Sequence, residues 1–152
     1  MIRVQRDIFD IGMEIEALTN ERTDIGAVVS FTGLVRDFND GSKVTGLSLE
    51  HYPGMTEREL AKIEEEARAR WDLQDSLIIH RYGEMALGEP IVLVVTASPH
   101  RQDAFEAAHF LMDWLKTKAP FWKQEMNASG KTNWVEERES DLKAARRWNS
   151  DA

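Results

Sequence analysis

Two lysines flank a short segment that can turn the chain back on itself. Lys116 and Lys123 stand on either side of a stretch rich in aromatic residues, in which Pro120 should end a helix. The turn can bring both ammonium groups to one apolar site. Burial and a neighbouring cation both lower the pKa of a lysine, which yields a neutral amine able to act as a base, an acid or a nucleophile. The alternative is that the two lysines only stabilise the end of a helix through its dipole.

A second pair of basic residues follows a serine and a proline. Ser98 suits the N-cap of a helix and Pro99 its first position, so His100 and Arg101 should lie in the first helical turn. Free backbone N–H groups and the positive end of the helix dipole favour an anion there, so two basic side chains are unusual in this position and can indicate an anion-binding site. Alternatively, both side chains reach solvent or pair with nearby carboxylates.

The two basic groups are too far apart to serve one small-molecule site within one chain. Between Arg101 and Lys116 the predicted helix rises by about 22 Å, at ~1.5 Å per residue. If both groups are functional, we expect a site shared between two copies of the chain, with His100 and Arg101 of one subunit facing Lys116 of the other.

Three further residues are candidates for substrate binding. Arg36 ends an apolar strand beside a loop of turn residues, which suits a gate over an anionic substrate. It can equally pair with a neighbouring aspartate. Phe31 and Met112 are most simply packing residues, although both can also line the pocket.

The strands that must position these residues are marked by alternating or continuous apolar residues. They are expected at residues 2–5, 26–36, 43–51, 76–82, 91–97, 121–125 and 134–135. The segment 91–97 is apolar on both faces, which predicts a central strand. Turn residues at 39–41 predict that the strands before and after them form a hairpin.

Four helices are expected. They cover residues 8–18, a segment opened by a capping box from Thr56 to Glu59, a segment that begins at Ser98 and stops before Pro120, and a last helix capped by Ser140. In the third helix, Phe105, Ala108, Met112 and Leu115 should form the buried stripe. The order of elements predicts an α+β fold with a mostly antiparallel sheet.

Composition excludes several classes of protein. A chain of 152 residues predicts a single domain over residues 1–152. The formal net charge of -8 argues against a general nucleic-acid binder. Cysteine is absent, which excludes disulfides, thiolate metal sites and a cysteine nucleophile.

The sequence also gives no sign of a metal site or a targeting segment. His51, His80 and His109 lack metal-ligand spacing, so we expect neither a metal nor a bound cofactor. The N-terminus lacks the apolar region of a signal peptide, and no apolar run is long enough to span a bilayer. We therefore expect a cytoplasmic protein with no membrane partner.

Several blocks of sequence, taken in order, carry a family resemblance. They are Gly26–Gly33 with Arg36, Leu49–Met55, His80-Arg81 with Gly83, Ser98–Arg101, Lys116–Lys123 with Glu125, and Trp134–Glu136. These blocks resemble the large, catalytic subunit of molybdopterin synthase over nearly the whole chain. Blocks in order are far more specific than any one short motif.

The resemblance implies a sulfurtransferase of molybdenum cofactor biosynthesis. Such an enzyme converts cyclic pyranopterin monophosphate, called precursor Z, into molybdopterin by installing the dithiolene sulfurs. A small ubiquitin-like subunit would carry the sulfur as a C-terminal Gly-Gly thiocarboxylate, within a heterotetramer built around a large-subunit homodimer. The fold implied is an α/β hammerhead with an additional α+β subdomain. The absence of cysteine agrees with a sulfur supplied by the partner.

The resemblance also implies roles for individual residues. Lys116 would lie beside the thiocarboxylate and Lys123 close to the pterin, both as catalytic residues. The substrate-binding residues implied are Arg36, His100, Arg101 and, from the second subunit, Arg138. Phe31, Met112, Phe121 and Trp122 would keep water away from a hydrolysable intermediate.

A second hypothesis belongs to a different class. The chain could be a non-catalytic docking module whose basic pocket captures the C-terminal carboxylate of a ubiquitin-like protein. Tail capture has no need of a second lysine, of Arg36 or of the His100 and Arg101 pair, so the sequence favours the enzyme. Another kind of phosphate-binding enzyme is disfavoured because no glycine-rich phosphate loop occurs.

Overall fold

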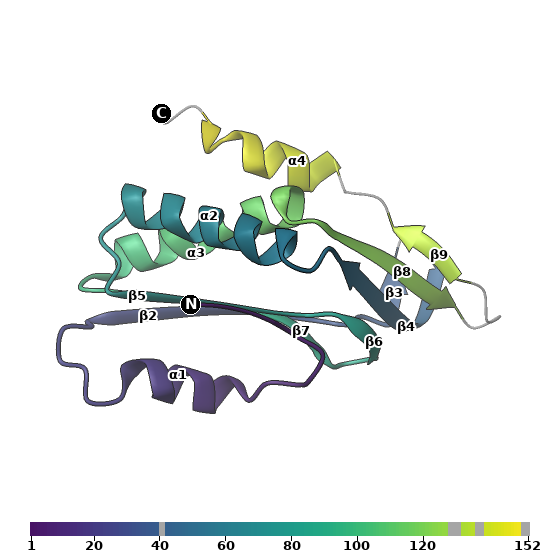
Figure 1. The fold of residues 1–152 in the computed structure, drawn as a ribbon, viewed down its shortest axis with the longest axis horizontal. Coiled ribbons are helices and arrows are strands. Elements are labelled where there is room, and N and C mark those ends of the chain that lie inside the picture. The colour runs from purple at the N-terminus through teal and green to yellow at the C-terminus, as the bar shows by residue number, and fades with distance from the viewer. Residues whose placement is uncertain (40–41, 128–131, 136–138, 150–152) are drawn as a thin grey trace.

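The computed structural model describes residues 1–39, 42–127, 132–135 and 139–149. In this part of the chain two sheets and four helices form a mixed α+β fold (Figure 1), as the sequence predicts. The strands are β1 Ile2–Gln5, β2 Ala27–Leu34, β3 Phe38–Asn39, β4 Ser42–His51, β5 Asp75–Arg81, β6 Gly83–Ala86, β7 Pro90–Ser98, β8 Phe121–Asn127 and β9 Thr132–Val135. The helices are α1 Ile11–Thr19, α2 Met55–Arg70, α3 Arg101–Lys118 and α4 Glu139–Arg146.

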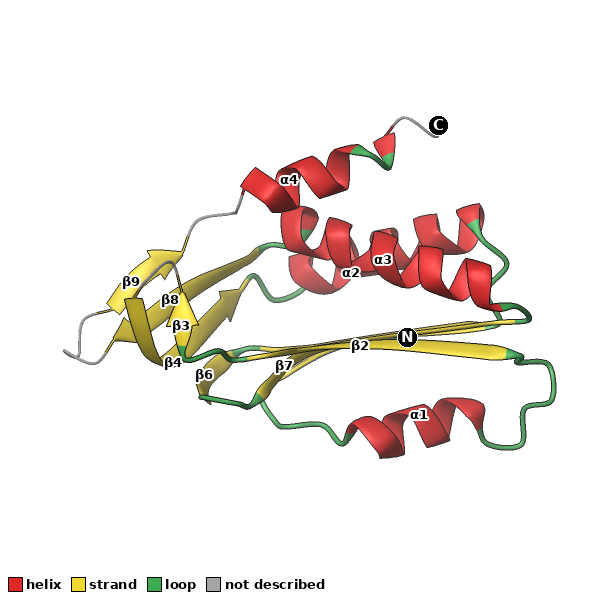
Figure 2. Cartoon of the chain, turned by 180° about the vertical axis from the view of Figure 1, so that it is seen from behind, coloured by secondary structure: helices red, strands yellow, loops and turns green. Residues whose placement is uncertain are grey.

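The first sheet has the strand order β1-β5-β7-β2. Only the β1–β5 pair is parallel. Strand β7 is central, as predicted, and Leu93, Val94 and Val95 are fully buried because both faces of the sheet are covered. Helices α2 and α3 cover one face and α1 covers the other (Figure 2).

The main core lies between this sheet and the helices α2 and α3. Leu60 and Ile63 of α2 pack there with Phe110 and Leu111 of α3 and with Val94 of β7. Helix α4 lies over the outer side of this helical layer, and Trp148, two residues beyond its end, packs edge-on against Trp71 and Phe110. The helical layer is therefore held together by an aromatic cluster, and α3 is its central element.

The second sheet lies at one end of the molecule (Figure 1). Its strand order is β3-β4-β8-β9, and β6 also pairs with β4. Strand β8 begins three residues after the last residue of α3 and runs antiparallel to β4. The end of α3 therefore leads directly into the second sheet.

The predicted hairpin between residues 26–36 and 43–51 is wrong. Strand β2 pairs with β7 in the first sheet, and β4 pairs with β8 and β6 in the second. The chain passes from one sheet to the other around Val35, which is buried. Strand β4 also pairs with the short strand β3. Pairing with β7 provides backbone partners for β2 along its whole length, from Ala27 opposite Ser98 to Leu34 opposite Pro90.

The starts of two helices also differ from the sequence prediction. Helix α2 is capped two residues earlier, where the Gly54 N–H donates to the Glu57 carboxylate at 2.6 Å. Helix α3 begins at Arg101 with His100 as its N-cap, because the Ser98 hydroxyl turns to the His100 carbonyl. The buried face of α3 is centred on Ala104, Ala108, Leu111 and Leu115, so the prediction that Phe105 is buried is wrong, and its side chain is 59% exposed. Within the described residues, no helix is long and apolar enough to cross a membrane.

Candidate active site

The C-terminal end of α3 and the start of β8 bring Lys116 and Lys123 together. Helix α3 ends at Lys118, and the chain becomes extended at Ala119, ahead of Pro120. In β8, Lys123 lies opposite Leu49 of β4, so its side chain shares the inward face of the sheet with that fully buried leucine. The side chains of Lys116 and Lys123 interact directly. The local turn therefore creates a pair of amines from residues on two elements.

The two lysines differ in their electrostatic state. The pKa of Lys123 is lowered to about 8, chiefly because the side chain is buried and then because the cation of Lys116 lies beside it. The carboxylates of Asp141 in α4 and Glu125 in β8 act in the opposite direction. At pH 7 roughly a tenth of Lys123 is therefore an uncharged amine, which can accept a proton or act as a nucleophile.

An aromatic wall lies beside the amine pair. Phe121 stacks on His80 of β5, with ring centroids 3.7 Å apart and planes inclined by 17°. On its other side Phe121 approaches His51, the last residue of β4, at 6.0 Å between centroids. Trp122 packs with Tyr52 at 4.7 Å between centroids, but side chains alternate along a strand, so Trp122 lies on the other face of β8 from Phe121 and Lys123. The aromatic wall beside the amine pair therefore consists of Phe121, His80 and His51.

His80 is a neutral member of this wall. Its side chain is buried, and Nδ1 lies 2.8 Å from the carbonyl oxygen of Arg81. A carbonyl only accepts, so Nδ1 carries the hydrogen. The pKa of His80 is lowered to about 3, chiefly by burial and also by the charges of Lys123 and Lys116, while the bond to the Arg81 carbonyl acts in the opposite direction. A third positive charge beside the lysines is thereby avoided.

His100 and Arg101 lie at the opposite end of α3. Both are exposed at the start of the helix, whereas Lys116 is in its last turn. Because the helix is continuous, the separation of about 22 Å expected from the sequence holds in the structure. One chain does not combine these residues with the lysine pair.

The other predicted site residues are scattered in a single chain. Arg36 is exposed just beyond β2, and Phe31 is 43% exposed within β2. Met112 is 9% exposed and belongs to the main core, so in this chain it acts as a packing residue. Arg138 lies outside the described residues.

Sequence reasoning missed three neighbours of the lysine pair. His80 interrupts the apolar strand β5, and a polar residue in a buried strand indicates that the side chain has a specific hydrogen-bond partner. His51 at the end of β4 gives a weaker signal of the same kind. Asp141 gives none, because only the packing of α4 brings it near Lys123.

Comparisons with known proteins identify the family of the chain. The family described as MoaE protein matches residues 4–118. The chain belongs to the MoaE family. A Molybdopterin synthase catalytic subunit from Pseudomonas aeruginosa is 58% identical over 147 residues, covering 97% of each chain. Its counterpart from Mesorhizobium japonicum is 55% identical over 150 residues, covering 98% of this chain and 93% of the relative.

Solved structures place the fold in the MoaE family as well. A molybdopterin biosynthesis MoaE protein from Burkholderia ambifaria superposes with a TM-score of 0.82 at 45% identity, covering 98% of this chain and 97% of that one. The family, the α+β fold and the enzyme class predicted from the sequence are therefore confirmed. The roles of the individual residues stay predictions.

Proposed function

We propose that this chain, as the catalytic subunit of a molybdopterin synthase, transfers sulfur from a C-terminal thiocarboxylate of a small ubiquitin-like subunit to cyclic pyranopterin monophosphate. The product would carry the dithiolene of molybdopterin. The observation that carries the proposal is the amine pair of the exposed Lys116 and the half-buried Lys123, with the pKa of Lys123 lowered to about 8. Its relatives are named as subunits, which supports a further chain in the complex.

The amine pair suits the proton transfers that this reaction needs. A thiocarboxylate is an anion, and the cation of Lys116 would hold it by a charge-assisted hydrogen bond. Lys123 would move protons as sulfur attacks the pterin and the cyclic phosphate opens, since an amine with a pKa near the working pH serves as both base and acid. The aromatic wall would protect the thiocarboxylate, or an acyl intermediate, from water.

The phosphate of the substrate needs cations besides Lys116, which the proposed mechanism assigns to the thiocarboxylate. We infer that His100 and Arg101 of a second copy complete the site, together with Arg36. Strand β2 supports a dimer because it is an edge strand with exposed apolar residues, Phe31 at 43% and Leu34 at 53%. Helix α3 packs beside β2 and adds Phe105 at 59%. An exposed apolar edge of this kind is suited to a partner.

A reconstitution tests the proposed function. The purified chain is mixed with precursor Z and the ubiquitin-like partner, which carries either a thiocarboxylate or an ordinary carboxylate. We expect the dithiolene product only with the thiocarboxylate. If the partner binds in both forms and no product appears under reducing, anaerobic conditions, the chain is a docking module and the proposal fails.

A further inference from the structure

A buried hydroxyl fixes the orientation of His51. Thr56, in the first turn of α2, is fully buried, and its Oγ1 lies 2.8 Å from the carbonyl oxygen of Tyr52. The same Oγ1 lies 3.1 Å from the backbone nitrogen of Tyr52 and 3.2 Å from Nδ1 of His51. Three polar groups therefore converge on one threonine hydroxyl next to the site.

This arrangement determines the position of the hydrogen on His51. Two oxygen atoms at 2.8 Å need a hydrogen between them, and a carbonyl supplies none, so the Thr56 hydroxyl donates to the Tyr52 carbonyl. The lone pairs of Oγ1 are then the acceptors for the Tyr52 N–H and for His51. Hence Nδ1 of His51 carries the hydrogen and Nε2 of the neutral ring has a free lone pair.

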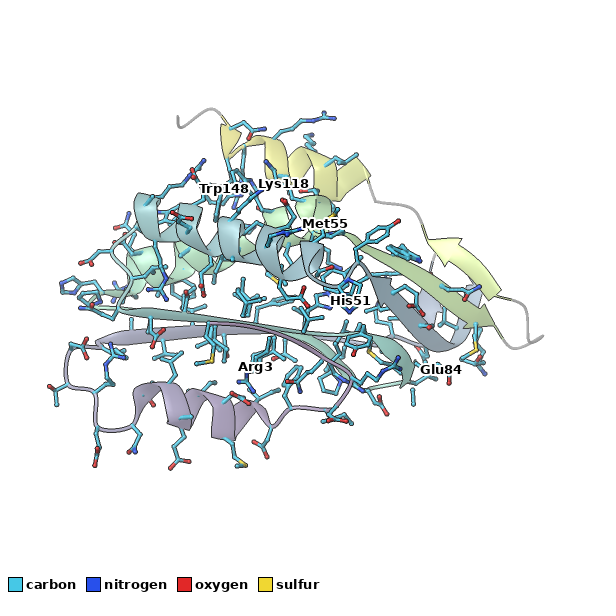
Figure 3. The ribbon with its side chains drawn as sticks, in the orientation of Figure 1. Arg3, His51, Met55, Glu84, Lys118 and Trp148 are labelled. Carbon is cyan, nitrogen blue, oxygen red and sulfur yellow. The ribbon has the colours of Figure 1, made fainter. Side chains whose placement is uncertain are left out.

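His51 lies close enough to Lys123 for the lone pair of Nε2 to accept a proton from it. His51 lies directly opposite Phe121 in the β4–β8 pair, and Lys123 is two residues further along β8. His51 and Lys123 are therefore diagonal neighbours on one face of the sheet, about 7–8 Å apart and within reach of a long side chain. Figure 3 shows His51 where β4 meets the helical layer.

The second imidazole beside the lysines is unsuited to carrying a proton. His80 is buried, and its electrostatic surroundings oppose a charge. His51 is only half-buried and its ring also contacts Tyr82, with centroids 4.5 Å apart. An imidazolium at His51 would keep contact with solvent and keep its Nδ1–H bond to Thr56. Of the two rings, His51 is the one whose surroundings tolerate protonation.

We propose that His51 is a further proton-transfer residue of the lysine site, with Nε2 accepting the proton that Lys123 gives up and Thr56 holding the ring in the required tautomer. The N–H bond at Nζ breaks, its electron pair stays on the amine, and a new N–H bond forms at Nε2. The reverse transfer restores the ammonium group. This inference rests on the proposed function, since it concerns the same lysine.

The first test is the tautomer itself, which needs no activity. Long-range proton–nitrogen NMR spectra of the imidazole rings distinguish a hydrogen on Nδ1 from one on Nε2. We expect the Nδ1–H form at His51 in the wild type and in Thr56→Ser, and loss of this preference in Thr56→Val. An Nε2–H form at His51 of the wild type overturns the proposal.

The second test is single-turnover kinetics with the thiocarboxylated partner. His51→Gln should slow the reaction by about 100-fold, in the usual range for a lost acid–base group, with unchanged binding of the partner. Thr56→Val should slow it by about tenfold and Thr56→Ser should restore it, because only the hydroxyl fixes the ring. In the His51→Gln background, Thr56→Val should add nothing, whereas a purely structural threonine would act additively.

The pH dependence of the same rate gives a third readout. The charged groups around Lys123 are Lys116, Glu125 and Asp141, and none of them is altered in these variants. Loss of His51 should therefore change the dependence of the rate on pH through the lost proton exchange with Lys123. As a matched control, His109→Gln changes an exposed histidine paired with Asp113 and should leave the profile unchanged.

The outcomes separate the two proposals. If the wild type makes no product, the proposed function fails. If the wild type is active and His51→Gln retains its rate within about twofold, the function stands and the role of His51 is refuted.

Discussion

At the scale of single residues, the site depends on which amines and imidazoles are charged. Burial lowers the pKa of Lys123, and the charge of Lys116 lowers it as well. The neighbouring His80 stays neutral for the same reason, since burial disfavours its charged form. The chemistry of the site is therefore set by desolvation first and by mutual repulsion second.

Removing the charge of Lys116 should raise the pKa of Lys123. A neighbouring cation disfavours protonation, so its loss in Lys116→Met lets Lys123 bind its proton more tightly, while burial keeps the pKa below 10.5. NMR titration of the isotopically labelled amine measures this value without any activity. Lys118→Met is the control, because Lys118 shares the helix end but lies 3.9 Å over the ring of Trp114. Equal pKa values of Lys123 in the wild type and Lys116→Met would contradict the coupling.

His80 should make the fold sensitive to acid. Its pKa is about 3 in the folded state and near 6.5 when unfolded, so the unfolded chain binds more protons between these values. Stability contributed by the neutral ring is thus present above pH 6.5 and is lost as the pH falls toward 3. His80→Gln removes this term, so its free energy of unfolding should fall less between pH 7 and pH 4, by more than about 1 kcal/mol.

Urea denaturation at several pH values measures the effect. His109→Gln serves as the control for an exposed histidine. Identical pH dependence in the wild type and in His80→Gln would show that His80 does not titrate as the structure indicates.

At the scale of elements, the contacts between residues close in sequence were predictable, whereas those between distant segments were not. Pro120 ends α3 and turns the chain, so the proximity of Lys116 and Lys123 was predictable from the eight residues 116–123 alone. The partner of β2 was not predictable from local turn signals, because β7 lies far along the chain. The same holds for His80, whose importance arises from a stack with Phe121 on another sheet.

The start of α3 is held by a close approach of two backbone segments. The Gly26 N–H donates to the Ser98 carbonyl at 3.0 Å, and a Cβ at Gly26 would lie 2.1 Å from the carbonyl oxygen of Pro99. The backbone of Pro99 would have to move to accommodate the added methyl group. Gly26→Ala should therefore destabilise the fold by about 2–4 kcal/mol. It should also displace His100 and Arg101, which follow directly.

A second glycine provides the matched comparison. Gly12 lies in α1 with its nearest neighbour, Asp10 Oδ1, at 3.5 Å from the position of a Cβ. Gly12→Ala should be neutral or stabilising by up to ~1 kcal/mol, because alanine favours helix. Thermal or urea unfolding measures both variants, and similar stabilities for the two would refute the proposed close contact.

At the scale of the whole molecule, the length of α3 separates the two basic groups of the site. The lysine pair lies at one end and His100 and Arg101 at the other, with the apolar edge of β2 beside the helix. An antiparallel arrangement of two copies would bring opposite ends of their α3 helices together. The central claim is that each active site takes its lysines from one chain and its phosphate-binding pair from another.

Complementation between inactive variants tests this claim most directly. Lys123→Ala and Arg101→Ala are unfolded together, refolded as a mixture and assayed by single turnover with the thiocarboxylated partner and precursor Z. Random pairing gives mixed dimers in half of the population, each with one intact site. The mixture should therefore recover about a quarter of the wild-type rate, although each variant alone is inactive. A mixture no more active than its two components, beside an active wild type, would contradict a site shared between chains.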